Sequence, residues 1–117
     1  MPYAVDLFCG AGGCSEGLIQ AGFHILFSSD ISDMVEVTYR HRHEQLGLIQ
    51  GVNTWFERAD IRNLTGADIH RHIANLEIFQ DQELPEIDLV IVAKVFHELV
   101  EETNPIPEIC YLVNMLE

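Results

Sequence analysis

Positive charge is scarce in this sequence. Its 117 residues include 6 Lys and Arg against 19 Asp and Glu, for a formal net charge of -13. Proteins that bind duplex DNA gain affinity by neutralising its phosphates with basic side chains, so this chain is expected to bind DNA poorly on its own. The sequence also starts without a basic segment or a long apolar run. This predicts neither a secretory signal nor a membrane span and makes the cytoplasm the expected location.

Cysteine is also scarce. Cys9, Cys14 and Cys110 are an odd number of cysteines, and they lack the paired spacing of a zinc site. Disulfides are not expected in a reducing cytoplasm, and free cysteines are among the residues most often buried, so we predict three small buried apolar side chains. With 48% hydrophobic residues the composition is that of a folded protein, and the length fits one domain over residues 1–117.

A glycine-rich stretch that begins at Asp6 is the most informative part of the chain. It is typical of the end of a buried strand, then a turn without bulky side chains, then a helix over residues 15–21. Glycine lets a ligand approach the main chain closely, and the first turn of a helix presents unpaired N–H groups. We therefore predict a cofactor cradle, although the spacing differs from the complete Gly-x-Gly-x-x-Gly dinucleotide fingerprint.

An acidic residue, Asp30, follows the first glycine by about 20 residues, at the end of the apolar run 24–29. In a strand–turn–helix–strand unit, a carboxylate at this place accepts hydrogen bonds from ribose hydroxyls. The pattern thus predicts a nucleoside-containing ligand. The alternative interpretation is that Asp30 caps a helix starting near Ser32 or Asp33.

The glycine-rich stretch reads Asp6-Leu7-Phe8-x-Gly10-x-Gly12-Gly13-x-x-x-Gly17-x-x-x-Ala21-Gly22-Phe23. It resembles the first motif of the cytosine-5 DNA methyltransferases, a family found in restriction-modification systems. The resemblance implies S-adenosylmethionine as the cofactor, S-adenosylhomocysteine as the product, and transfer of a methyl group to C5 of cytosine in DNA. It also implies an α/β, three-layer, Rossmann-like methyltransferase fold. A nicotinamide-dependent enzyme is the alternative, which the glycine spacing disfavours.

The resemblance implies cofactor-binding roles at three places in the chain. The glycine turn would lie against the methionine moiety, and Phe8 would pack near the adenine. Asp30, where the family usually has Glu, would hold the ribose, and Ile31 would pack on the adenine face. A third motif, Asp60 and the apolar residue after it, would read the adenine edge. The predicted cofactor-binding residues are Phe8, Gly10, Ala11, Gly12, Gly13, Asp30, Ile31, Asp60 and Ile61.

Apolar periodicity predicts the remaining elements. We expect helices over residues 33–46 and 66–76, strands over 55–59 and 87–93, and an acidic loop over 77–86. By resemblance, a further helix is expected over 95–102 and a fifth strand over 109–114. Together with the two N-terminal strands, this makes a mostly parallel sheet of about five strands in a domain that is truncated relative to the family.

The helix over residues 33–46 carries the one basic segment, 40–43. We interpret this segment as a solvated helix end; phosphate or metal binding is the less favoured alternative, because two His at i and i+2 do not face one ligand. The inner side of the helix is predicted to include Met34, Val37, Tyr39 and His41. Trp55, at the start of the next strand, is predicted to belong to the core.

The resemblance ends after the fourth predicted strand. The family continues there with a Pro-Cys pair that supplies the nucleophile, whereas this sequence continues Ala93-Lys94-Val95-Phe96. The family's fifth strand has a Glu before its Asn, and here Val113, which can neither donate nor accept a proton, precedes Asn114. We therefore predict no catalytic residue, no metal site and no activity of the chain alone.

Two hypotheses remain within the family. In the first, the chain is one subunit of a split methyltransferase: it reaches DNA only through a partner or a complete enzyme, and its open sheet edge contacts a second methyltransferase chain or another copy of itself. In the second, it is a cofactor-binding remnant without catalysis. Both predict that S-adenosylmethionine binds.

Overall fold

The computed structural model of the protein describes residues 2–7, 9 and 13–92. Strands and helices alternate along this part of the chain. The strands are β1 (Tyr3–Leu7), β2 (His24–Asp30), β3 (Trp55–Arg58) and β4 (Leu89–Val92). The α-helices are α1 (Gly13–Gln20), α2 (Asp33–Gln45) and α3 (Gly66–Ala74), and two short 3-10 helices span Ile61–Asn63 and Glu77–Phe79.

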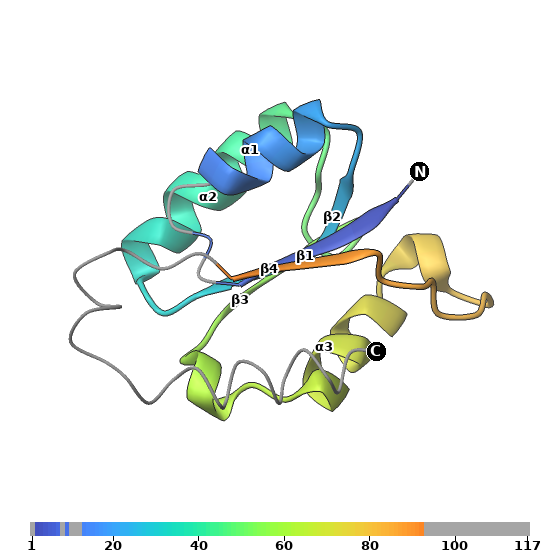
Figure 1. The fold of residues 1–117 in the computed structure, drawn as a ribbon. Coiled ribbons are helices and arrows are strands. Elements are labelled where there is room, and N and C mark those ends of the chain that lie inside the picture. The colour runs from blue at the N-terminus through green and yellow to red at the C-terminus, as the bar shows by residue number, and fades with distance from the viewer. Residues whose placement is uncertain (1, 8, 10–12, 93–117) are drawn as a thin grey trace.

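The described strands form one parallel sheet in the order β3-β2-β1-β4. Helices α1 and α2 cover one face of the sheet and α3 covers the other, so the domain has three layers (Figure 1). This confirms the predicted α/β class and the parallel sheet. The expected helix over 95–102 and the fifth strand over 109–114, with Val113 and Asn114, lie outside the described residues.

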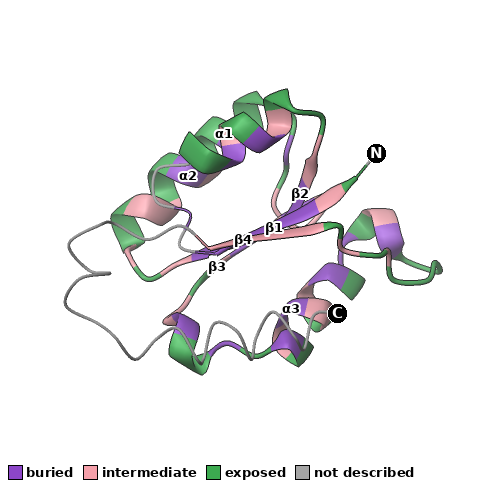
Figure 2. Ribbon diagram, in the orientation of Figure 1, coloured by how far each residue is buried: buried purple, intermediate pink, exposed green. Residues whose placement is uncertain are grey.

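The core lies on both faces of the central strands. On the α3 side, Val5 and Leu7 of β1 pack with Phe27 of β2 and with Ile69 and Ile73 of α3. On the other side, the main apolar cluster is small and consists of Ala4, Leu18, Ile25 and Leu48. Figure 2 shows the buried residues along the strands and the exposed residues on the outer faces of the helices.

Helix α3 has the clearest local signals. The side chain of its N-cap residue, Thr65, accepts a hydrogen bond from the Asp68 amide at 3.1 Å, and the Asp68 carboxylate accepts one from the Thr65 amide at 3.2 Å. This capping box satisfies two amides at the helix start. Ile69 and Ile73 then fall on one face, four residues apart, and are buried.

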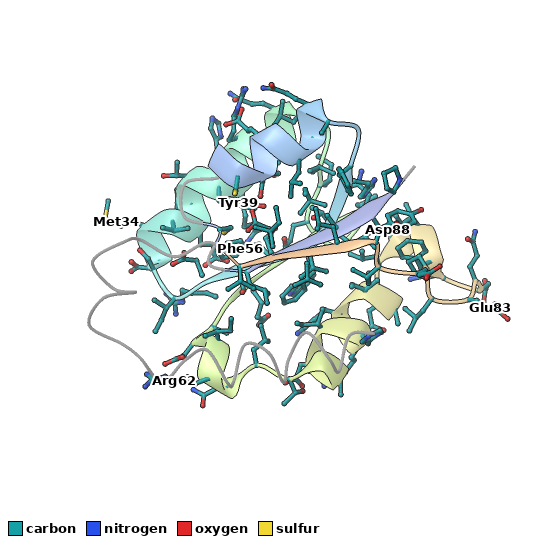
Figure 3. All side chains as sticks on the ribbon, viewed as in Figure 1. Met34, Tyr39, Phe56, Arg62, Glu83 and Asp88 are labelled. Atoms are coloured by element: carbon teal, nitrogen blue, oxygen red, sulfur yellow. The ribbon has the colours of Figure 1, made fainter. Side chains whose placement is uncertain are left out.

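The predicted inner face of α2 is confirmed at Tyr39 and wrong at Met34, Val37 and His41. Met34 and Val37 are 77% and 72% exposed and His41 is also exposed, whereas the residues that turn inwards are Val35, Tyr39 and His43. Figure 3 shows Met34 pointing away from the sheet and Tyr39 lying between α2 and the sheet. Apolar periodicity failed because the two buried side chains of this helix are a phenol and an imidazole, while Met34 and Val37 face solvent.

Three smaller expectations are also corrected. His43 is buried, so the basic segment is not wholly a solvated helix end. Cys14 is exposed, because it lies on the outer side of α1, whereas Cys9 is buried as predicted and Cys110 lies outside the described residues. The expected loop over 77–86 begins with a 3-10 turn that buries Phe79. Trp55 is half-buried and packs against the core, as predicted.

Candidate functional site

The carboxyl ends of the parallel strands meet at one edge of the sheet, and the predicted site residues follow them. β2 and β3 end side by side, because Asp30 pairs with Arg58 and the Ala59 amide donates to the Asp30 carbonyl at 3.0 Å. The Cys9 amide donates to the Ser29 carbonyl at 3.0 Å, which holds the end of β1 at the same edge. The segments after β1, β2 and β3 are therefore brought together here.

Asp30 is the last residue of β2, with its carboxylate at this edge. One carboxylate oxygen accepts a hydrogen bond from the Ser32 amide at 3.1 Å. The N-cap of α2 is Ser32 rather than Asp30, since the Ser32 hydroxyl accepts from the Val35 amide at 3.4 Å. The alternative interpretation, that Asp30 caps this helix, is therefore wrong.

Ile31 and Asp60 flank this position. Ile31 directly follows Asp30 and its side chain is 65% exposed. Asp60 begins the 3-10 turn after β3; its carboxylate accepts from the Arg62 amide at 2.9 Å and forms an ion pair with the Arg62 guanidinium at 2.6 Å. Ile61 is buried in the core on the α3 side, so its side chain points away from the edge.

The remaining predicted site residues belong to the glycine turn. Gly13 is the first residue of α1, and a Cβ added to it would meet no atom within 4 Å, so the space beside it is open. Phe8 and residues 10–12, which include Gly10, Ala11 and Gly12, lie outside the described residues. Among the residues that the structure does describe, no cluster of His, Cys, Asp or Glu could hold a metal ion.

A buried polar network lies behind the edge, and the sequence reasoning missed it. The Ser15 hydroxyl of α1 donates a very short hydrogen bond to the Asp6 carboxylate of β1 and lies 2.6 Å from the Tyr39 hydroxyl of α2. The Tyr39 hydroxyl in turn lies 2.5 Å from the Ser28 hydroxyl of β2. All four side chains are buried. A polar residue inside an otherwise apolar strand, as Asp6 is, was the signal that could have found the network.

Burial dominates the electrostatics of this network. It raises the pKa of Asp6 from 3.8 to about 6; the hydrogen bond from Ser15 acts against this shift, and the negative charge of Asp30 adds to it. Burial also raises the pKa values of the Cys9 thiol and the Tyr39 phenol far above their usual ranges, so both groups are neutral. Cys9 is thus not an activated nucleophile.

His43 lies next to the network. Its ring stacks on the Tyr39 ring with centroids 3.8 Å apart, and its Nδ1 lies 2.9 Å from the Tyr39 carbonyl oxygen. Burial lowers the pKa of His43, so the imidazole is neutral. The residue therefore helps to pack α2 on the sheet and is not a phosphate ligand.

Comparison with known proteins places this arrangement in a family. Residues 3–91 match the family described as C-5 cytosine-specific DNA methylase. The chain belongs to this family. C-5 cytosine-specific DNA methylases use S-adenosylmethionine, and the match spans the strands, helices and strand ends from which the candidate site is built.

Individual relatives of this methylase chain match it less completely. It is 49% identical over 39 residues to the type II methyltransferase M.AgeI of Thalassovita gelatinovora, a stretch that is 33% of this chain and 9% of that protein. The structure of the S. pombe Dnmt2 methyltransferase superposes with a TM-score of 0.50 at 14% identity, covering 97% of this chain and 39% of that one. A Streptococcus thermophilus rRNA methylase gives a TM-score of 0.43 at 17% identity, covering 86% and 66%. The methylase chain therefore spans a minor part of M.AgeI and of Dnmt2. No helix in the described residues has the length and apolarity to cross a membrane.

Proposed function

We propose that this chain binds S-adenosylmethionine at the carboxyl edge of its sheet and is the cofactor-binding portion of a cytosine-5 DNA methyltransferase. The observation that carries the proposal is the meeting of Asp30, Ile31 and Asp60 at the adjoining ends of β2 and β3. A nucleoside needs hydrogen-bond acceptors for its ribose and an apolar surface for its base, and these residues provide both.

The residues present fit this cofactor. The Asp30 carboxylate would accept hydrogen bonds from the ribose hydroxyls, and the exposed Ile31 side chain would pack on the adenine. Asp60 would read the adenine edge, together with the main chain at Ile61, since the Ile61 side chain is turned into the core. Gly13, with open space beside it, would lie near the methionine moiety together with the rest of the glycine turn. When bound, the cofactor supplies the methyl group of the family reaction.

The chain alone is proposed to be inactive. Cytosine C5 methylation needs a thiolate nucleophile close to the flipped base. The sequence has no Pro-Cys pair after β4, and the buried Cys9 at the candidate site is held neutral. A partner chain would have to bring the nucleophile and the contacts to DNA, in keeping with the strongly acidic composition.

Two forms of this function are distinguished by their partners. A subunit of a split enzyme would use an apolar surface to contact its partner. A cofactor-binding remnant would have no such partner and would yield no methylation in any mixture.

Calorimetric titration of the purified chain with S-adenosylmethionine tests the proposal. We expect saturable binding that weakens at least tenfold in Asp30→Ala, the loss expected when a charge-assisted hydrogen bond worth roughly 1.5 to 3 kcal/mol is removed. Asp33→Ala is the matched control, because Asp33 is an exposed acid three residues further along and should leave binding unchanged. A folded chain that binds no cofactor would refute the assignment.

A further inference from the structure

The proposed function leaves one buried charge unused. Asp6 is fully buried in the central strand β1, on the face covered by α1 and α2. One of its carboxylate oxygens accepts the hydrogen bond from Ser15, and the other has no hydrogen-bond partner among the described residues. A buried carboxylate that is not fully paired costs stability, so its presence calls for an explanation.

When the Asp6 carboxylate is ionised, the donor and acceptor of each hydrogen bond in the hydroxyl network around it are fixed. An ionised carboxylate only accepts, so Ser15 must donate to it. The Ser15 oxygen then accepts from Tyr39, and the Tyr39 oxygen accepts from Ser28. The partners of the charge are thus neutral hydroxyls. Among the described residues, the charge that acts on Asp6 is that of another carboxylate, Asp30.

Asp6 lies close behind the candidate site. It pairs in register with Ser28, which stands two residues before Asp30 on β2. A strand advances about 3.3 Å per residue, so the Asp6 charge lies roughly 7 Å behind the carboxyl edge. In a buried setting of low effective dielectric, a charge acts strongly over such a distance. Asp6 thus adds a negative charge behind an edge that also carries the carboxylate of Asp30 and the guanidinium of Arg58.

We propose that Asp6 is a specificity-determining residue, which makes the site favour the positively charged sulfonium of S-adenosylmethionine over the uncharged thioether of S-adenosylhomocysteine. The inference rests on the proposed function. The two ligands share the adenosine, the ammonium and the carboxylate, and they differ in one methyl group and one positive charge. Hydrogen bonds to the shared groups cannot discriminate between them, whereas a fixed negative charge behind the site can.

The test measures the affinities of both ligands by calorimetry for the wild type, Asp6→Asn and Tyr39→Phe. Asn keeps the shape of the side chain and an acceptor for Ser15 but removes the charge. We expect Asp6→Asn to lower the preference for S-adenosylmethionine roughly tenfold, as for unit charges about 10 Å apart at an effective dielectric of about 20. Tyr39→Phe breaks the network but keeps the charge, so it should change both affinities equally and leave their ratio intact.

A second arm uses the wild type alone and needs no substitution. The preference should fall as the pH is lowered from 7.5 to 5, because Asp6, with a pKa of about 6, then becomes neutral. The titratable groups that face Asp6 or its network are Cys9, Asp30, Tyr39 and His43. The raised pKa values of Cys9 and Tyr39 keep these two groups neutral in this range, and His43, whose pKa is lowered by burial, is present in both the wild type and Asp6→Asn. Asp30 is present in both proteins, so the change in slope between the wild type and Asp6→Asn isolates Asp6.

The outcomes separate the inference from the proposed function. If a folded chain binds neither ligand, the proposed function fails. If both ligands bind but Asp6→Asn and low pH leave their affinity ratio unchanged, the proposed function stands and the role of Asp6 is refuted. A loss of preference in Asp6→Asn, with the ratio intact in Tyr39→Phe, supports the role.

Discussion

Replacing Asp6 by Asn should stabilise the protein, and the gain should depend on pH. Burial raises the pKa of this carboxyl from 3.8 to about 6, which means that the fold disfavours its ionised form. Well below pH 3.8 the group is protonated in both the folded and the unfolded chain, so it has no effect on stability. As the pH rises towards 6, the unfolded chain loses its proton first, and the folded state becomes progressively less favoured.

The magnitude follows from the size of the shift. A difference of about two pKa units corresponds to about 3 kcal/mol in the free energy of unfolding. Asp6 is fully buried, so solvent screening does not reduce this figure much. Above pH 7 the wild type carries the whole cost. Asp6→Asn avoids it and can still accept the hydrogen bond from Ser15.

Urea denaturation followed by Trp55 fluorescence at pH 4 and pH 7.5 checks this prediction, since Trp55 is the single tryptophan. The stability of Asp6→Asn relative to the wild type should rise by about 2.4 kcal/mol between the two pH values, because the unfolded chain is already partly ionised at pH 4. Asp81→Asn is the control: Asp81 is exposed and has a φ of 66°, a conformation that Asn also tolerates. The reasoning would be refuted if the difference in unfolding free energy between Asp6→Asn and the wild type did not change with pH. It would also be refuted if the wild type became more stable relative to Asp6→Asn as the pH rises.

Three further substitutions probe the fold. Tyr39→Phe leaves the buried Ser15 and Ser28 hydroxyls without their shared partner and should cost about 2 kcal/mol in urea denaturation; an unchanged midpoint would show that the network does not stabilise the fold. Thr65→Ala removes the capping box of α3 and should cost about 1 kcal/mol, with Thr65→Ser restoring most of it. Ile73→Ala opens a cavity under α3, where the side chain is 1% exposed, and should cost about 3 kcal/mol; a cost below that of Thr65→Ala would mean that this core is loosely packed.

Much of the fold and part of the site could be predicted from the sequence, because these features are encoded locally. The apolar runs that became β1, β2 and β4 are long enough to mark buried parallel strands, and Thr65 and Asp68 mark the start of α3. Asp30 could be placed at a strand end from its position after such a run. The consequence, that the ends of β2 and β3 meet, then follows from the parallel sheet alone.

What could not be predicted depends on contacts between elements. The inner face of α2 is formed by Val35, Tyr39 and His43; Tyr39 was predicted there, whereas His43 was not, because a buried imidazole adds nothing to an apolar pattern. Tyr39 is buried because Ser15 and Ser28, from two other elements, provide partners for its hydroxyl. The 3-10 turn after β3 likewise could not be predicted in detail. In this turn Asp60 forms an ion pair with Arg62 and the Ile61 side chain is buried, and the motif itself specifies neither feature.

Asp6 links stability to the proposed function. Its replacement by Asn should stabilise the fold, and it is also the residue inferred to favour a cationic ligand. Sites that carry such a cost are commonly functional, because an apolar or neutral residue would serve the fold better. If Asp6→Asn raised stability and left ligand preference unchanged, the cost of Asp6 would have no functional explanation in the present account.

The central claim is that the cofactor binds at the carboxyl edge of the sheet. The most direct measurement is a titration of the isotope-labelled chain with S-adenosylmethionine, followed through the backbone amide signals in two-dimensional NMR. The account predicts saturable shifts at Gly13, Ile31 and Ile61, which follow β1, β2 and β3, and none at Glu77 or Ile78, in the 3-10 turn beyond α3. Shifts confined to that 3-10 turn, or no shifts in a folded chain, would contradict it.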